Sequence, residues 1–115
     1  MIRLEEKPFE LEGKRYLLRC NMAVLEGFEE ANGDIQAAME QPVRAVALTL
    51  LQLMLNDYAE EQGWDETWTA GRLKRRVSYA MLMELDLVGM LFRALTPAAK
   101  EKPAEGEKKP AESGN

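Results

Sequence analysis

The longest apolar stretch of the chain, residues 42–62, begins with Pro42 and is followed directly by Gly63. Proline is favoured at the first position of a helix, and glycine adopts the left-handed conformation that often ends one, so this stretch predicts a helix. Within residues 43–55 the only side chains that are not apolar belong to Arg44, Thr49 and Gln52. A helix that is apolar on nearly every side is normally buried, so other segments or a partner chain must surround it.

One narrow stripe of this predicted helix is polar but uncharged. On a 3.6-residue period it consists of Gln41, Ala45, Thr49, Gln52 and Asn56. The apolar run is also shorter than the roughly 20 residues that a bilayer-spanning helix needs, and charged residues flank it closely. We therefore expect a buried helix, no membrane span and no membrane partner.

Residues 2–20 predict a β-hairpin. Apolar and acidic residues alternate through FELEG, Gly13 lies at the turn, and a second apolar run leads toward Cys20. Pro8 marks the first strand as an edge or irregular strand, because proline cannot donate to a ladder. An isolated hairpin is barely stable in water, so one of its faces must pack on the helices.

Shorter helical segments are predicted before the central helix. Asn21 is a typical N-cap residue for a helix that ends at Asn32 and Gly33. Asp34 then caps a further short turn ahead of Pro42. Together with the segments that follow the central helix, these pieces predict a compact bundle of four to five helices around one long helix. The fold class is mainly α with a small N-terminal hairpin (α+β).

The segment after the central helix contains two tryptophans, Trp64 and Trp68. We expect them to anchor the loop between helices, although such rings also stack on bases or peptides. Thr69 is a typical cap for a helix through residues 72–77, which either continues or bends near Ser78.

The final apolar stretch, residues 79–95, predicts a helix with very few charges, namely Glu84, Asp86 and Arg93. One of its faces is made by Met81, Leu85, Val88, Phe92 and Leu95, and much of another by Met83, Leu87, Met90, Leu91 and Ala94. The two apolar helices present more apolar surface than a hairpin and short helices can cover, so part of it must meet another protein. We expect the second face to bind a partner, and core packing is the alternative, because methionine and leucine serve both purposes.

The composition changes after residue 96. Residues 97–115 combine Lys, Glu, Pro and small residues, and cannot bury enough apolar surface to offset the entropy of ordering. We predict a disordered tail there and a single domain over residues 1–96. Residues 1–95 carry 11 basic and 16 acidic side chains, and the remainder carries four of each, so the domain holds the whole net charge of −5.

The residue types present do not favour a catalytic site. The chain has no histidine, and its single cysteine, Cys20, excludes an internal disulfide and a cysteine-based metal cluster. We therefore expect no enzyme, no cofactor and no metal site, and a buried, unreactive Cys20 in a reducing compartment. The one basic cluster is a candidate contact for phosphate or an acidic partner, with a solvated face as its alternative: Arg72, Lys74, Arg75 and Arg76.

The order of these parts resembles the tail assembly chaperones of long-tailed phages and prophages. The resemblance covers residues 7–97 and starts with KPFELEGKRYLLRCNMAVLEGFEEANGDI, a strand pair that leads into a small helix and a Gly-Asp-Ile turn. It continues through a long apolar helix, a charged helix and a final apolar helix that ends in ALTP.

This resemblance implies a small helical adaptor that is not an enzyme. Members of that family coat the tape-measure protein and recruit tail-tube subunits in the host cytoplasm, and they are absent from the finished virion. Self-association through the apolar helices stays open as a further expectation. The competing class is a small regulatory protein that binds nucleic acid through the basic cluster at residues 72–76, which the net acidic charge of the domain argues against.

Overall fold

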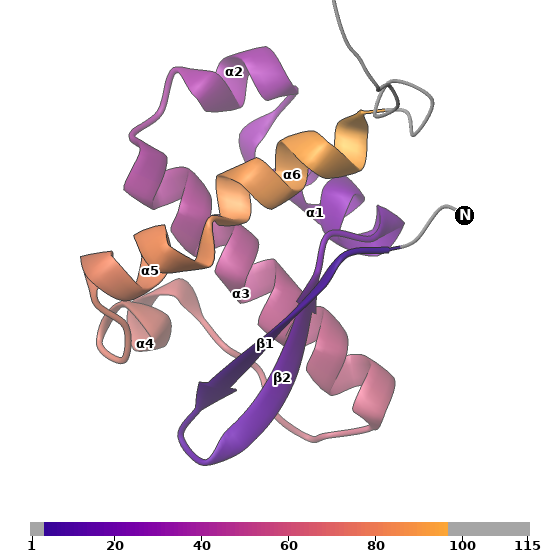
Figure 1. The fold of residues 1–115 in the computed structure, drawn as a ribbon, viewed down its shortest axis with the longest axis vertical. Helices are drawn as coiled ribbons and strands as arrows, with labels where there is room; N and C mark the ends of the chain where they lie inside the picture. Colours follow the sequence, from indigo (N-terminus) through magenta and orange to yellow (C-terminus); the bar gives the residue numbers. More distant parts are fainter. Residues whose placement is uncertain (1–3, 97–115) are drawn as a thin grey trace, which may run out of the picture.

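A 20-residue helix, α3 (Val43–Gln62), crosses the centre of the molecule (Figure 1). The structure is a computed structural model and describes residues 4–96, so the predicted tail at residues 97–115 lies outside the described residues. The fold is mainly helical, with one antiparallel hairpin at its N-terminal end, as the sequence predicts. Pro42 precedes the first helical residue, and Gly63 ends the helix in the left-handed conformation with φ 78°.

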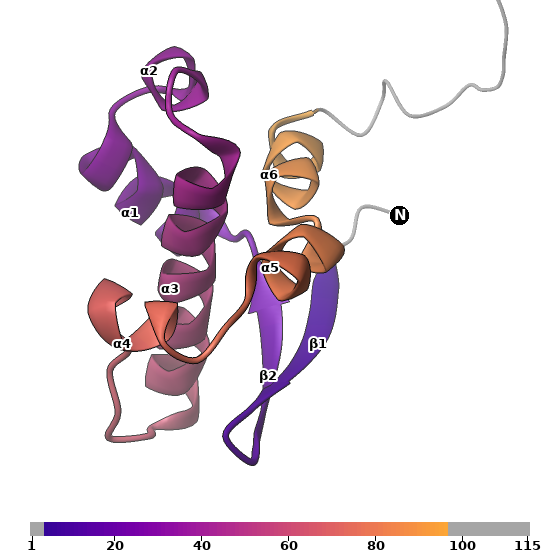
Figure 2. The same ribbon diagram turned by 90° about the vertical axis from the view of Figure 1, so that its left-hand side faces the viewer.

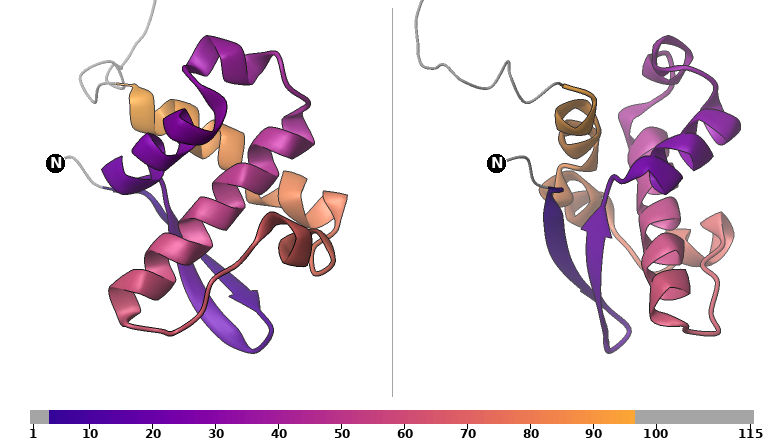
Figure 3. Two further views of the ribbon diagram at one scale, coloured as in Figure 1. Left: turned by 180° about the vertical axis from the view of Figure 1, so that it is seen from behind. Right: turned by 90° about the vertical axis from the view of Figure 1, so that its right-hand side faces the viewer.

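The other elements surround α3 on two sides (Figures 2 and 3). On one side lie α1 (Met22–Asn32) and α4 (Ala70–Lys74), and on the other lie the hairpin, α5 (Tyr79–Leu85) and α6 (Leu87–Leu95). The short helix α2 (Ile35–Met39) connects α1 to the start of α3. The buried side chains of α3 therefore face both layers: Val46, Ala47, Leu50, Leu51, Met54, Leu55 and Ala59.

The hairpin consists of β1 (Glu6–Leu11) and β2 (Lys14–Arg19), joined by a two-residue turn. Both turn residues, Glu12 and Gly13, have positive φ angles of 52° and 81°, which suit the twist of a tight hairpin. Leu11 pairs with Lys14 beside the turn. The alternation of the ladder then leaves Pro8 at a position that does not hydrogen-bond across the hairpin, so its missing N–H costs nothing there.

Side-chain caps begin four of the helices. Asn21 accepts a hydrogen bond from Val24 N at 2.9 Å, Asp34 from Ala37 N at 2.9 Å, and Thr69 from Arg72 N at 3.1 Å. These three caps confirm the sequence predictions. The fourth cap is Ser78, whose Oγ accepts a hydrogen bond from the backbone of the first turn of α5. A new helix therefore begins at this position, and the preceding helix does not continue through it.

The prediction of one continuous helix over residues 79–95 was wrong. Asp86 adopts a left-handed conformation, with φ 53° and ψ 49°, and separates α5 from α6. Both short helices lie across α3, one on each side of the break (Figure 1). The break interrupts a segment whose local sequence favours a continuous helix.

Candidate functional site

The face of the final helix that the sequence assigned to a partner belongs largely to the core. Leu87, Met90 and Leu91 are buried, Met83 is half-buried, and only Ala94 is exposed. These side chains lie in the same hydrophobic core as the apolar surface of α3. The prediction that Leu87, Met90 and Leu91 form an exposed partner surface was therefore wrong, because all three are buried in the core.

The apolar surface that remains uncovered lies on the opposite side of α6. We call this the outer α6 face and define it as Val88, Phe92 and Leu95, which follow the i, i+4, i+7 spacing of one helix face. Phe92 is 41% exposed, Leu95 is 39% exposed and Val88 is half-buried. The exposed apolar side chains of α6 thus lie on the face that the sequence did not select.

Ion pairs join Arg93 of α6 to Glu5, the residue before β1, and to Asp86. Arg93 donates to both carboxylate oxygens of Glu5 at 2.9 Å, and a third contact reaches Asp86 at 3.4 Å. The hydrogen bonds from Arg93 hold the pKa of Glu5 below its usual range, and Glu5 in turn raises the pKa of the guanidinium. The outer α6 face therefore belongs to a helix whose position is fixed beside β1.

Further exposed apolar side chains occur at separate places in the fold. Met39 and Val43 lie around the corner between α2 and α3, Met22 begins α1, and Tyr79 begins α5. Single exposed apolar residues are common on protein surfaces and carry no assignment by themselves. The outer α6 face differs because its members follow one helix at regular spacing.

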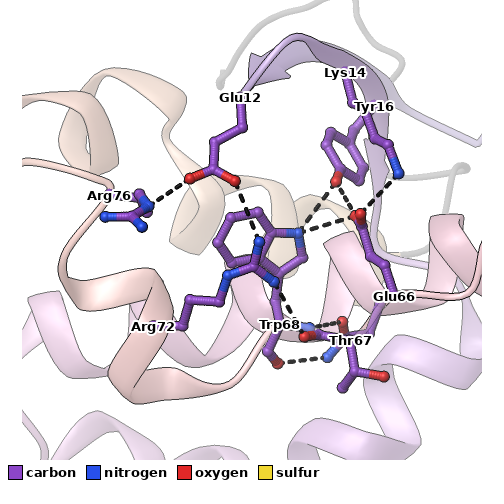
Figure 4. Close-up of polar contacts among 9 residues, drawn as sticks. Glu12, Lys14, Tyr16, Glu66, Thr67, Trp68, Arg72 and Arg76 are labelled. Atoms are coloured by element: carbon purple, nitrogen blue, oxygen red, sulfur yellow. Dashed lines mark hydrogen bonds and ion pairs between the residues drawn. The ribbon is translucent and has the colours of Figure 1, made fainter.

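The predicted basic cluster is divided by contacts within the chain (Figure 4). Arg72 and Arg76 both donate to the carboxylate of Glu12 in the hairpin turn. The guanidinium of Arg72 also lies 3.9 Å from the ring centre of Trp68. Lys74 and Arg75 are exposed and form no ion pair within residues 4–96. Half of the cluster therefore fastens the hairpin to α4 rather than forming a free cationic surface.

Trp68 anchors the loop before α4, as the sequence predicts. Its ring is buried, and its indole N–H lies 3.1 Å from Tyr16 Oη and 3.2 Å from the carboxylate of Glu66. Its backbone N–H donates to Asn56 Oδ1 at 2.7 Å, and its carbonyl accepts from Asn56 Nδ2 at 2.9 Å and from Gln52 at 3.1 Å. The uncharged polar stripe of the central helix thus binds the backbone of this loop, a role that the sequence pattern did not reveal.

Trp64, the second tryptophan, is half-buried in an aromatic group. It packs edge-on against Tyr16 at 5.5 Å and Tyr58 at 5.7 Å between ring centres, a favourable geometry for aromatic pairs. Lys14 lies over the Trp64 ring at 4.7 Å. Contacts within the chain therefore account for the positions of both tryptophan rings without a ligand.

Tyr16 has a large shift in its pKa. Burial of the phenol, together with its hydrogen bond to Glu66, raises the pKa of Tyr16 to about 12. Hydrogen bonds from Lys14 at 2.8 Å and from Tyr16 hold the pKa of Glu66 below its usual range. Tyr16 therefore remains a protonated donor to a charged acceptor, which suits a structural bond better than proton transfer.

Cys20 is buried, and burial raises the pKa of its thiol. This agrees with the expected packing role, since reactive cysteines are exposed and have a lowered pKa. Within residues 4–96 no group of three or more histidine, cysteine or acidic side chains is arranged to bind a metal ion. Nor does that part of the chain contain a helix with the length and hydropathy to cross a bilayer.

Comparison of the chain with protein-family models, curated proteins and solved structures found no match. The surface described above is therefore the basis for assigning a function. Its distinctive feature is the outer α6 face.

Proposed function

We propose that the protein is a non-enzymatic assembly chaperone that binds an apolar helical segment of a partner through the outer α6 face. The observation that carries this proposal is the exposure of Phe92 and Leu95, together with half-buried Val88, along one side of α6. Apolar side chains at i, i+4 and i+7 are the spacing with which one helix packs along another. Because α6 is held by Glu5 and packs on α3, the face is presented on a fixed support.

The resemblance to phage tail assembly chaperones identifies the partner that we propose. A tape-measure protein is a long chain with apolar helical stripes, which need cover until the tail tube forms around them. An adaptor that covers such a stripe reversibly would act in the host cytoplasm, recruit tail-tube subunits and leave before the virion is complete. A modest apolar face is suited to this task, because a small buried area permits release.

Nucleic-acid binding through residues 72–76 is less well supported. Arg72 and Arg76 already share the carboxylate of Glu12, so a phosphate would have to displace it. Of the four residues in this cluster, Lys74 and Arg75 alone form no ion pair within the described residues, and the domain as a whole is acidic. Binding to duplex DNA without a steep dependence on salt would exclude phosphate contacts altogether.

The proposal predicts that Phe92→Asp and Leu95→Asp each weaken binding to a tape-measure fragment by about 10- to 100-fold. This range corresponds to the roughly 1.5–3 kcal/mol contributed by a buried apolar side chain, converted at 1.4 kcal/mol per tenfold. The measurement is isothermal titration of the full 115-residue chain with the purified fragment.

Tyr79→Asp supplies the matched control. Tyr79 is the more exposed aromatic residue, at 63%, but lies on α5 and outside the outer α6 face. Its substitution should leave the affinity within about twofold of the unmodified chain. Undiminished binding by both α6 variants, or a larger loss in Tyr79→Asp, would refute the proposed site.

A further inference from the structure

The first strand of the hairpin has a free edge. Strand β2 lies beside α3, and β1 lies on the outside of the hairpin (Figures 2 and 3). Within residues 4–96, β1 pairs with β2 alone, so the backbone groups along its other edge have no strand beside them. Such an edge can pair with a strand of another molecule, and a second copy of the chain always supplies one.

The register of the hairpin identifies the backbone groups on this edge. Leu11 and Lys14 flank a two-residue turn and therefore form a hydrogen-bonded pair, as do Phe9 and Tyr16 two positions along. The residues of β1 between these pairs direct their backbone groups away from β2. They are exposed and lie at every second position: Glu6, Pro8 and Glu10.

Pro8 occupies the middle of this outward row. Proline has no backbone N–H, so the row has three carbonyl oxygens but donors only at Glu6 and Glu10. The Cδ atom of the proline ring takes the place of the missing hydrogen and points toward any strand that would pair there. Within the hairpin the missing N–H costs nothing, because it does not face β2. The proline therefore interrupts only the edge that faces outward.

A second copy would meet this interruption twice. Two β1 strands that pair antiparallel around a two-fold axis at Pro8 place the two prolines opposite each other, so both hydrogen bonds of the central pair are missing. The same arrangement places Glu6 of each copy opposite Glu10 of the other. Like charges directly opposite each other destabilise a sheet. The centre and both flanks of this pairing are therefore unfavourable.

We propose that Pro8, together with Glu6 and Glu10, keeps the free edge of β1 from pairing with the same edge of a second copy. The hairpin thereby stays a two-stranded unit packed on its own helices. This inference concerns contacts between copies of the chain, so it does not depend on the partner proposed for the outer α6 face.

Two substitutions should open the edge. Pro8→Thr restores the N–H with a residue that favours strands, and the hairpin should stay intact because the position is exposed. Glu6→Lys turns the like-charge pair with Glu10 of the second copy into an opposite-charge pair. The double variant Pro8→Thr, Glu6→Lys carries both changes, and Glu6→Lys alone is the matched control that keeps the proline. Circular dichroism first establishes that each full-length variant is folded.

Amide hydrogen exchange followed by NMR reports on this edge specifically. The N–H of Glu10 faces outward in the separate chain and should exchange rapidly. In a pair of β1 strands the same N–H donates to the second copy, so it becomes protected as the protein concentration rises. Association through the outer α6 face would leave this amide unprotected, which distinguishes the two kinds of contact.

We expect concentration-dependent protection of the Glu10 amide in the double variant, with an association constant at least about tenfold above that of Glu6→Lys. The unmodified chain should show no such protection. An unprotected Glu10 amide in the double variant at every concentration would overturn the proposal. Equal association of the double variant and Glu6→Lys, or protection of this amide in the unmodified chain, would overturn it as well.

Discussion

Leu91→Asp is expected to unfold the domain, whereas Phe92→Asp, one residue further along the same helix, should leave it folded. Leu91 is buried in the core shared with α3, and Phe92 is one of the most exposed apolar residues of α6. Removal of a buried leucine costs about 2–5 kcal/mol, and burial of an unpaired carboxylate adds a further large penalty. The sum approaches the entire stability of an ordinary small domain, which is about 5–15 kcal/mol.

Urea unfolding followed by circular dichroism measures this contrast. Leu91→Ala gives the cost of the lost contacts alone, about 2–5 kcal/mol, and separates it from the effect of the charge. Phe92→Asp should change the free energy of unfolding by less than about 1 kcal/mol, as is usual for surface substitutions. Equal destabilisation by both aspartate variants would show that α6 does not pack on α3 with the face described above.

Trp68→Ala should lower the free energy of unfolding by about 3–5 kcal/mol, the usual cost of removing a large buried aromatic side chain. Trp68 is buried between the central helix and the hairpin, and its indole N–H bonds both Tyr16 and Glu66. The substitution also removes the ring over which the guanidinium of Arg72 lies. We expect loss of this side chain to loosen the hairpin as well as the loop.

Trp64→Ala is the matched control for this effect. Trp64 is the same residue type four positions earlier but is only half-buried, so its removal should cost less than half as much in the same unfolding measurement. Tyr16→Phe, which removes one hydroxyl and leaves the ring, should cost about 1 kcal/mol. If Trp64→Ala proved as costly as Trp68→Ala, the described anchor would not be the main support of the loop.

Local sequence signals predicted most of the elements. The caps at Asn21, Asp34 and Thr69 and the glycine that ends α3 each depend on a residue and its immediate neighbours, so they are readable without the fold. The hairpin was predictable for the same reason, because its turn and the alternation beside it are local. The burial of α3 followed from its composition alone.

Features that depend on distant partners were not predictable in the same way. The carboxylate of Glu12 forms ion pairs with Arg72 and Arg76, which lie 60 and 64 residues further along the sequence. The residues next to Glu12 in the sequence give no signal of these pairs. The polar stripe of α3 was recognisable as uncharged, but its partners were not: Asn56 and Gln52 bind the backbone of Trp68. A side chain shows its type in the sequence, but its bonding partner depends on the tertiary structure.

The sequence-based prediction of which apolar face of the final helix is exposed was wrong for a related reason. Both faces carry large aliphatic or aromatic residues, so hydrophobic periodicity cannot distinguish the side that packs on α3 from the side that faces outward. The break at Asp86 also rotates α6 relative to α5, which a continuous helical pattern does not anticipate. Which face of α6 is exposed could therefore be learned only from the structure.

Hydroxyl-radical footprinting of the full chain, alone and with a tape-measure fragment, measures whether the outer α6 face is the binding surface. It reports the solvent access of individual side chains, and Tyr79 serves as an exposed internal reference on α5. We expect Phe92 and Leu95 to become protected in the complex while the modification of Tyr79 is unchanged. Unchanged modification of Phe92 and Leu95 in a demonstrated complex would contradict the assignment of the outer α6 face as the binding surface.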